Sequence, residues 1–258
     1  LLALTISAFA IGTTEFVIVG LVPTIAEQLA ISLPSAGLLV SIYALGVAVG
    51  APVLTALTGR FPRKQLLVAL MVLFTAGNIL AWQSPDYSTL VIARLLTGLA
   101  HGVFFSIGST IATSLVPKEK AASAIAIMFG GLTVALVTGV PLGTFIGQHF
   151  GWRETFLAVS LLGVIALVAS LLLVPSSIPG RASASLSDQV KVLTHPRLLL
   201  IYAVTALGYG GVFTAFTFLA PMMQELAGFS PGAVSWILLG YGISVAIGNI
   251  WGGKLADK

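Results

Sequence analysis

The sequence has 258 residues, of which 57% are hydrophobic and 8% are charged. Ordinary soluble domains carry about 25% charged residues, so this composition excludes a water-soluble globule and indicates a membrane protein. The chain has no cysteine and three histidines, which excludes disulfides and thiolate metal sites and argues against a zinc cluster. We therefore expect neither a metal nor a cofactor.

Eight apolar segments follow one another along the chain, and each is long enough to cross a bilayer, which takes about 20 residues. Proline and glycine residues at the breaks indicate turns and helix starts. The predicted spans are 1–26, 35–58, 64–82, 88–115, 119–147, 153–174, 197–223 and 231–256. The sequence therefore predicts an all-α membrane protein with eight transmembrane helices.

The basic residues indicate how these helices are oriented. Ten of the twelve Lys and Arg residues fall in every second loop and at the C-terminus, whereas the opposite loops hold only Arg153 and one span holds Arg94. Because cytoplasmic loops carry the excess of Lys and Arg, we expect a cytoplasmic N-terminus. The basic residues form no single patch, which argues against nucleic acid as a partner despite the net charge of +4.

An internal repeat relates the beginning of the chain to its end. Residues 1–60 aligned without gaps on 199–258 give 13 identities, against about five expected from composition. Two parallel six-helix repeats are typical of one large transporter architecture. We expect a six-helix bundle at 1–174, a cytoplasmic linker at 175–196 and the start of a second bundle at 197–258. Four further helices, about 115 residues, would then follow Lys258.

Four sequence motifs resemble one transporter family. They are "TTEFVIVGLVP" from Thr13, "TALTGRFPRK" from Thr55, "RLLTGLAHG" from Arg94 and "GVPLGTFIG" from Gly139. The chain is identified as a member of the major facilitator superfamily, within its drug/proton antiporter branch, and resembles bacterial sugar (arabinose-like) efflux proteins. The resemblance implies the major facilitator fold, a bacterial inner-membrane location and a transporter rather than an enzyme.

The resemblance also implies roles for a loop and a helix bend. Arg60, Arg63 and Lys64 match a basic loop that latches one conformation, although Gly59 stands where the family has an acidic residue. Asp257 in the second repeat is an alternative acidic partner, and the loop could instead contact anionic lipid. Gly139, Pro141 and Gly143 match a motif that seals and hinges the contact between the halves, and close helix packing is the alternative reading.

Glu15, Arg94 and His101 lie deep inside predicted spans and are the candidates for proton coupling or solute contact. Glu15 lies about eight residues, or roughly 12 Å, below one end of the first helix, and Arg94 lies at a similar depth in the fourth. A charge at a helix centre costs about 2.5–3.5 kcal/mol, so we expect both to face the bundle and to pair there. His101 shares a helix face with Arg94 and suits a proton relay. The alternatives are a fixed ion pair, Arg94 bonded to helix carbonyls, and a packed histidine.

Aromatic residues near these positions are candidates for lining a central cavity, although most aromatics at helical spacing are packing residues. The candidates are Tyr43, Phe104, Phe105, Tyr209 and Phe213.

The sequence thus predicts a secondary active transporter that exports a sugar or drug-like solute in exchange for protons. Its partners would be the solute, protons and membrane lipid, and we expect a monomer. No phosphate-binding loop of the GxxxxGK[ST] type occurs, which argues against ATP as the energy source. Proton-coupled uptake and a non-transporting receptor or scaffold of the same fold remain as alternatives.

Overall fold

The computed structural model describes residues 1–58, 61–176, 178 and 194–256. Helices make up most of these ranges, and the described residues contain no strand. Seven helices are long and apolar enough to cross a membrane, and a bent pair at the start of the chain makes an eighth span. The predicted all-α architecture with eight spans is confirmed.

The first span is a pair of helices rather than the single helix predicted from the sequence. α1 (Leu2–Phe16) and α2 (Ile18–Gln28) meet at an angle of 43°. The break lies at Val17, and Pro23, which has no N–H to donate, lies farther along, inside α2. The bend follows directly after Glu15 and Phe16.

The next three spans are continuous helices, and the fifth carries a local irregularity. The continuous helices are α3 (Leu33–Thr58), α4 (Arg63–Trp82) and α5 (Tyr87–Ser114). The fifth span consists of the short η1 (Lys118–Lys120), α6 (Ala121–Val134), the π-helical turn η2 (Ala135–Gly139) and α7 (Val140–Phe150). Pro141 follows η2 by two residues, so the wider turn lies where the proline interrupts the α-helical hydrogen bonds.

The sixth span is α8 (Trp152–Leu173), and two further spans follow the connection after it. They are α10 (Pro196–Thr217), which continues into α11 (Leu219–Pro221) and the π-helical turn η3 (Met222–Leu226), and α12 (Pro231–Ala256). Both bounds of α12 lie 198 residues after the bounds of α3. The predicted repeat is therefore visible in the helices themselves.

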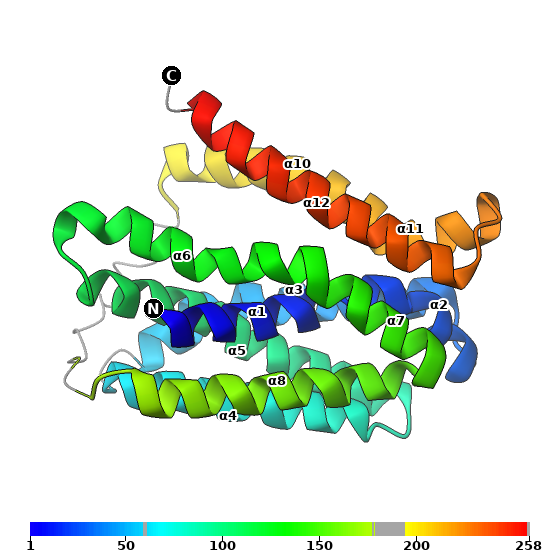
Figure 1. Ribbon diagram of the computed structural model, residues 1–258, viewed down its shortest axis with the longest axis horizontal. Coiled ribbons are helices and arrows are strands. Elements are labelled where there is room, and N and C mark those ends of the chain that lie inside the picture. Colours follow the sequence, from blue (N-terminus) through cyan, green and yellow to red (C-terminus); the bar gives the residue numbers. More distant parts are fainter. Residues whose placement is uncertain (59–60, 177, 179–193, 257–258) are drawn as a thin grey trace.

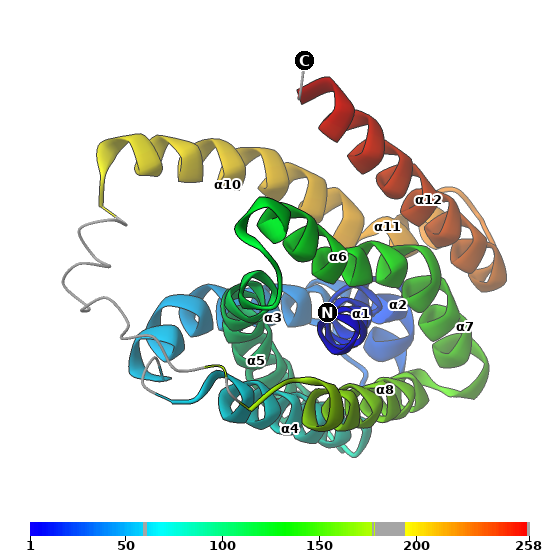
Figure 2. The same ribbon diagram turned by 60° about the vertical axis from the view of Figure 1, so that its left-hand side comes forward.

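The helices form a bundle with a smaller layer against one side. Figure 1 shows α4 and α8 along one edge of the bundle and α10, α11 and α12 above α6 and α7. In both ribbon views α10 and α12 run close to the bundle at their α11 end and diverge from α6 toward the end that holds the N-terminus (Figures 1 and 2). The space between the two layers therefore widens toward that end.

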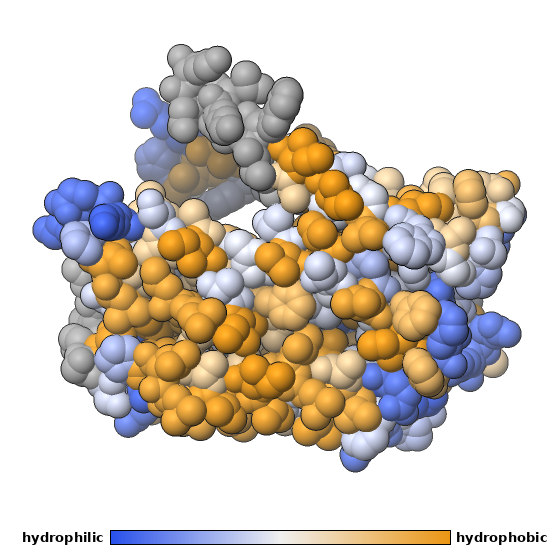
Figure 3. All heavy atoms as spheres, in the orientation of Figure 1, coloured by the Kyte–Doolittle hydropathy of each residue, from blue (hydrophilic) through white to orange (hydrophobic). Residues whose placement is uncertain are grey.

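The surface of the bundle matches a bilayer environment. In Figure 3 hydrophobic residues cover the middle of the visible face, and hydrophilic residues gather at its two ends. Exposed side chains on α8 include Leu161, Val164, Ile165, Val168 and Leu172. A soluble protein rarely leaves such a continuous apolar surface uncovered, so this face fits contact with lipid.

Glycine residues bring α3 and α5 together near the polar residues. A Cβ on Gly98 of α5 would overlap the carbonyl oxygen of Tyr43, and one on Gly102 would lie 2.9 Å from the backbone nitrogen of Ala51. Small residues allow this close backbone approach. Because Gly98 lies between Arg94 and His101 in the sequence, the contact places Tyr43 against both of them.

Candidate functional site

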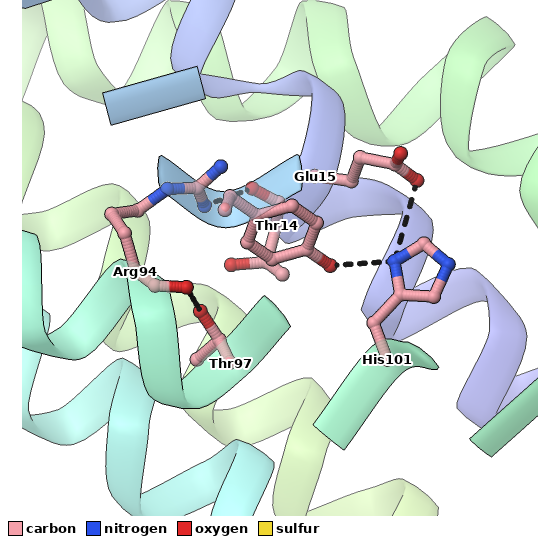
Figure 4. A network of polar contacts seen from close by, with 6 residues as sticks. Thr14, Glu15, Arg94, Thr97 and His101 are labelled. Carbon is pink, nitrogen blue, oxygen red and sulfur yellow. Dashed lines mark hydrogen bonds and ion pairs between the residues drawn. The ribbon is translucent and has the colours of Figure 1, made fainter. Parts of the chain in front are cut away.

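The candidate site is a polar cluster where α1, α3 and α5 meet. Glu15 is the next-to-last residue of α1, Tyr43 lies in the middle of α3, and Arg94 and His101 lie two turns apart on α5. Figure 4 shows Glu15 and His101 pointing toward one another, while the Arg94 side chain extends toward Thr14. The structure thus brings Glu15, Arg94 and His101 into one cluster, and their roles stay predictions.

Arg94 is fixed by backbone carbonyls and one aromatic ring. Its Nη1 donates to the carbonyl oxygen of Thr14 at 2.7 Å and its Nε to that of Leu39 at 3.3 Å. The guanidinium carbon lies 4.2 Å from the centroid of the Tyr43 ring, within the range of a cation–π contact. Arg94 is 1% exposed, and its Nη2 has no hydrogen-bond partner among the described residues.

Glu15 contacts His101 rather than Arg94. Its Oε2 lies 3.8 Å from Nδ1 of His101, and the two side chains are 20% and 12% exposed, respectively. The same Nδ1 lies 3.0 Å from the hydroxyl of Tyr43. The expected direct Glu15–Arg94 pair is thus replaced by the alternative in which Arg94 bonds helix carbonyls. The carbonyl of Thr14, next to the bend after α1, accepts from Arg94, and this geometry cannot be derived from residue spacing.

A second polar pair supports this cluster, and the sequence analysis did not single it out. The hydroxyl of Thr14 donates to Oδ1 of Asn78 at 2.6 Å, and Nδ2 of Asn78 donates to the carbonyl of Phe74 at 2.9 Å. Asn78 is 1% exposed. A carboxamide inside an apolar span is costly to bury unless it is hydrogen-bonded. The presence of Asn78 in the third predicted span could therefore have indicated a buried polar partner.

A cavity of about 780 Å³ lies beside the cluster, between the first six spans and the last two. Tyr209 and Phe213, two of the predicted cavity aromatics, line it together with Phe16 and Phe129. Phe105 lies between His101 and Phe129, with ring centroids 4.9 Å and 4.8 Å away and the ring planes tilted by 58° and 38°. Tyr43 belongs to the polar cluster instead.

Phe104 was another predicted cavity aromatic, and this prediction is wrong. Its side chain is fully buried in a hydrophobic core that also contains Phe74, Ile107 and Met128. Phe104 and Phe105 are neighbours on α5 and therefore point in different directions, so only one of them can face the cavity.

The glycine motif of the fifth span packs mainly within the first six spans. A Cβ on Gly139 would overlap Thr13, and one on Gly143 would overlap Val17, so both glycines face α1 and the start of α2. Pro141 is buried on the same segment. This geometry matches the packing alternative, and any hinge role of these residues stays a prediction.

The contact between the first six spans and α12 uses a different glycine. A Cβ on Gly242 of α12 would overlap the carbonyl oxygen of Leu136 in η2. Nearer the α7 end, the hydroxyl of Ser235 donates to Oε1 of Gln148 at 3.3 Å. Gly242 was missed because a single glycine in an apolar span carries no pattern that distinguishes close contact from chance.

The predicted basic loop is described only in part. Arg63 begins α4 and is 7% exposed, and Lys64 follows it on the same helix. Arg60 and Asp257 lie outside the described residues. The latch role of the four residues therefore stays a prediction.

Comparison with known proteins identifies the family. The family model described as Major Facilitator Superfamily matches residues 4–258. The chain belongs to this superfamily. Similar proteins are named as transporters. The uncharacterized MFS-type transporter YtbD of Bacillus subtilis is 55% identical to this chain over 258 residues. The inner membrane transport protein YdhP of Escherichia coli is 46% identical over the same length. The putative transporter AraJ of E. coli is 36% identical.

Solved structures show the same major facilitator fold. A bacterial homologue of the lysosomal transporter Spinster, in an inward-facing and occupied conformation, superimposes with a TM-score of 0.75 at 20% identity, covering 100% of this chain and 60% of its own. A D-xylose–proton symporter gives 0.70 at 18% identity, covering 94% and 65%. The chain spans 65% of the length of YtbD and of AraJ and 66% of that of YdhP. It is a multi-pass membrane protein of a transporter family, not of an enzyme family.

Proposed function

We propose that this protein is a secondary active transporter that exports a small solute across the bacterial inner membrane in exchange for protons. One observation carries the proposal: Glu15 and His101 form a partly exposed titratable pair inside the membrane-spanning bundle, beside a cavity lined by two groups of helices. Ionisable residues inside a membrane are costly and mark ion or substrate pathways.

The arrangement of the helices supports alternating access. We assign residues 1–174 to one rocking bundle, 175–196 to a cytoplasmic linker and 197–258 to the second bundle. The two approach closely where Gly242 meets η2 and Ser235 meets Gln148, and they diverge toward the end that holds the N-terminus. With that end cytoplasmic, as the basic loops predict, the structure is open to the inside.

The polar cluster offers two arrangements for its carboxyl group. An ionised Glu15 is attracted to the guanidinium of Arg94, whose Nη2 is unpartnered among the described residues, and to His101 when the imidazole is protonated. A protonated Glu15 loses both attractions. Because a ligand or proton shifts an equilibrium only through its different affinity for the two states, a proton on Glu15 can bias the opening of the bundle if Glu15 is placed differently in each state.

Two alternatives are separated from export by direct measurement. The resemblance of the "GVPLGTFIG" segment to antiporter sequences favours export over proton-coupled uptake, and the direction of flux under a fixed gradient decides between them. A receptor or scaffold of the same fold would show no solute flux at all. We further propose that the transporter acts as a monomer in contact with membrane lipid.

The test replaces Glu15 in the full-length protein. In proteoliposomes with an imposed proton gradient, the wild type should move one member of a solute panel against its gradient. Glu15→Gln should abolish this uphill movement while leaving solute exchange without a gradient, because the amide keeps the size of the side chain but cannot exchange a proton. Glu225→Gln, at an exposed residue of η3, is the control and should behave as the wild type. Uphill transport by Glu15→Gln would refute the proposal.

A further inference from the structure

The chemistry of the cavity walls narrows the class of solute. The cavity is lined by residues of α1, α6, η2, α10 and α12, of which the described ones include none with a formal charge. Three lining residues carry a side-chain hydroxyl, namely Thr133, Tyr209 and Tyr241. The remaining lining residues are Phe16, Phe129, Leu132, Leu136, Gly208, Val212, Phe213, Phe216 and Val245. Its volume of about 780 Å³ is in the range of small-molecule sites.

We infer that this cavity binds an uncharged, planar aromatic solute rather than a sugar, an inference that rests on the transport function proposed above. A sugar carries a hydroxyl on almost every carbon, and each polar group buried without a partner costs about 1–3 kcal/mol. The described walls offer three hydroxyl side chains, which are too few to satisfy the hydroxyl groups of a sugar ring packed against them. A site that recognises hydroxyls is built from polar partners, and these walls are built from rings and aliphatic chains.

The aromatic rings on the α10 and α12 side are arranged to accept another flat ring. Phe216 and Tyr241 stack with centroids 4.6 Å apart and planes 19° apart, and Tyr209 and Phe213 stack at 6.0 Å and 29°. Phe16 from α1 approaches Phe213 at 6.2 Å. Offset-stacked and edge-to-face contacts of this kind favour a planar aromatic guest. Tyr209 is 66% and Phe129 40% exposed, so rings on both sides of the cavity are still free to pack against a solute.

The internal repeat explains why the two sides of the cavity differ. At the offset of 198 residues, Glu15 corresponds to Phe213 and Tyr43 corresponds to Tyr241. The first repeat thus has a carboxylate where the second has a phenyl ring. Glu15 and His101 lie on the first-repeat side of the cavity, and the two stacked ring pairs lie on the second-repeat side. We therefore assign proton binding to the first repeat and ring stacking with the solute to the second.

The absence of charge on the described walls argues against a cationic solute as well. The formal charges near the cavity are those of Glu15 and Arg94, which are opposite in sign and belong to the same cluster. Aromatic rings can attract a cation through cation–π contacts, but the described lining has no carboxylate to neutralise one, and an unpaired charge is expensive to bury. The walls therefore suit a neutral molecule best.

Aromatic contacts connect the proton site to this solute site. The ring of Phe105 contacts the ring of His101 and that of Phe129, which lines the cavity, in tilted arrangements. A change in the position of His101 would therefore be passed to a ring that touches the solute. This connection, together with walls drawn from both repeats, favours a transported solute as the occupant over a further segment of the protein.

The test measures equilibrium binding to the full-length protein in nanodiscs, without a proton gradient and with empty nanodiscs subtracted. The probes are 2-naphthol as the neutral aromatic, L-arabinose as the sugar and tetraphenylphosphonium as the aromatic cation. We expect 2-naphthol to bind most tightly. Phe213→Leu, which keeps the site apolar but removes the ring, should weaken its binding about tenfold, or about 1.4 kcal/mol. Phe150→Ala, at a residue that is 70% exposed outside the cavity, should change nothing.

Each other outcome overturns the inference. Three results would do so: tighter binding of L-arabinose or tetraphenylphosphonium, unchanged naphthol affinity in Phe213→Leu with an unchanged melting temperature, and no binding of any probe. Gradient-driven flux is measured separately on the same preparations. Uphill sugar transport would refute the proposed solute class but support the transport function. Naphthol binding without uphill flux of any solute would support the solute class but refute the transport function.

Discussion

At the scale of single residues, Arg94 has the most constrained environment of the candidate site residues. It lies in a buried position where its guanidinium bonds two carbonyls from different helices and covers the ring of Tyr43. Only arginine presents donors in a planar fork that can reach both carbonyls and stack on a ring at the same time. Its first task is therefore to hold α1, α3 and α5 together around Glu15 and His101.

Replacing Arg94 by lysine should destabilise the bundle even though the charge is kept. A single ammonium group cannot reproduce both carbonyl bonds and the ring contact, and a hydrogen bond to a charged group contributes about 1.5–3 kcal/mol. We expect Arg94→Lys to lower the free energy of unfolding by about 2 kcal/mol, measured as a lower melting temperature in detergent. Arg197→Lys, at an exposed residue of α10, is the control. Equal melting temperatures for Arg94→Lys and the wild type would contradict this role.

How far the sequence predicted the site depended on the kind of interaction. The cost of burying charge predicted that Glu15 and Arg94 would turn inward, and the helical spacing from Arg94 predicted the same for His101; all three side chains do so. Neither could predict the partner of each group, because the bend after Phe16 decides which carbonyl Arg94 reaches, and the angle of a bend is not encoded in residue spacing. Phe104 and Phe105 show the same limit: both are aromatic, and only the rotation of α5 decides which one faces the cavity.

At the scale of secondary-structure elements, α5 positions both Arg94 and His101, so its start is important for the site. Asp86 caps this helix, and its carboxylate accepts a hydrogen bond from the backbone N–H of Thr89 at 2.8 Å. This backbone bond lowers the pKa of Asp86 below its ordinary value. The cap satisfies an N–H that has no partner within the helix.

The cap predicts a dependence of stability on pH. Because the folded-state pKa is lowered, the ionised carboxylate stabilises the fold at pH values above the ordinary aspartate pKa of about 3.9. That contribution is lost as the pH falls through the lower folded-state value. Asp86→Ala should therefore melt at a lower temperature than the wild type at neutral pH, with the difference shrinking in acid. Asp86→Asn, which can still cap the helix, should stay near the wild type at neutral pH. A difference that is independent of pH would contradict the role of the ionised cap.

The bounds of the elements were predicted more reliably than their irregularities. Proline and glycine punctuation placed every span within a few residues, and the repeat placed α12 in register with α3. The π-helical turn η2 was not predicted, although Pro141 suggested a bend nearby, because the position of such a turn depends on how α12 packs against it. Gly242, which makes that contact, gave no separate signal.

At the scale of the whole molecule, the orientation in the membrane decides whether the space between the two layers opens to the cytoplasm or to the outside. The two layers diverge at the end that holds the N-terminus, so a cytoplasmic N-terminus makes this an inward-open state. The predicted orientation rests on ten basic residues in alternate loops and at the C-terminus. These residues act during membrane insertion, so the contacts within the folded bundle do not report the orientation.

Site-directed labelling checks the orientation. The 258 residues contain no cysteine, so single cysteines are introduced at Gln83 and Lys118, both exposed, and the full-length protein without them gives the background. In intact cells with a permeabilised outer membrane, a membrane-impermeant maleimide should label Gln83→Cys and leave Lys118→Cys unlabelled until the inner membrane is opened. The opposite pattern would invert the proposed orientation and would make the structure outward-open.

The central claim is that a proton on Glu15 changes how far the two layers open. Spin labels at cysteines replacing Lys118 and Arg197 report the distance across the widening end in the full-length protein, without any knowledge of the solute. The distance distribution should shift between about pH 5 and about pH 8 in the wild type and should not shift in Glu15→Gln. An identical shift in both proteins would show that Glu15 is not the group whose protonation drives the opening.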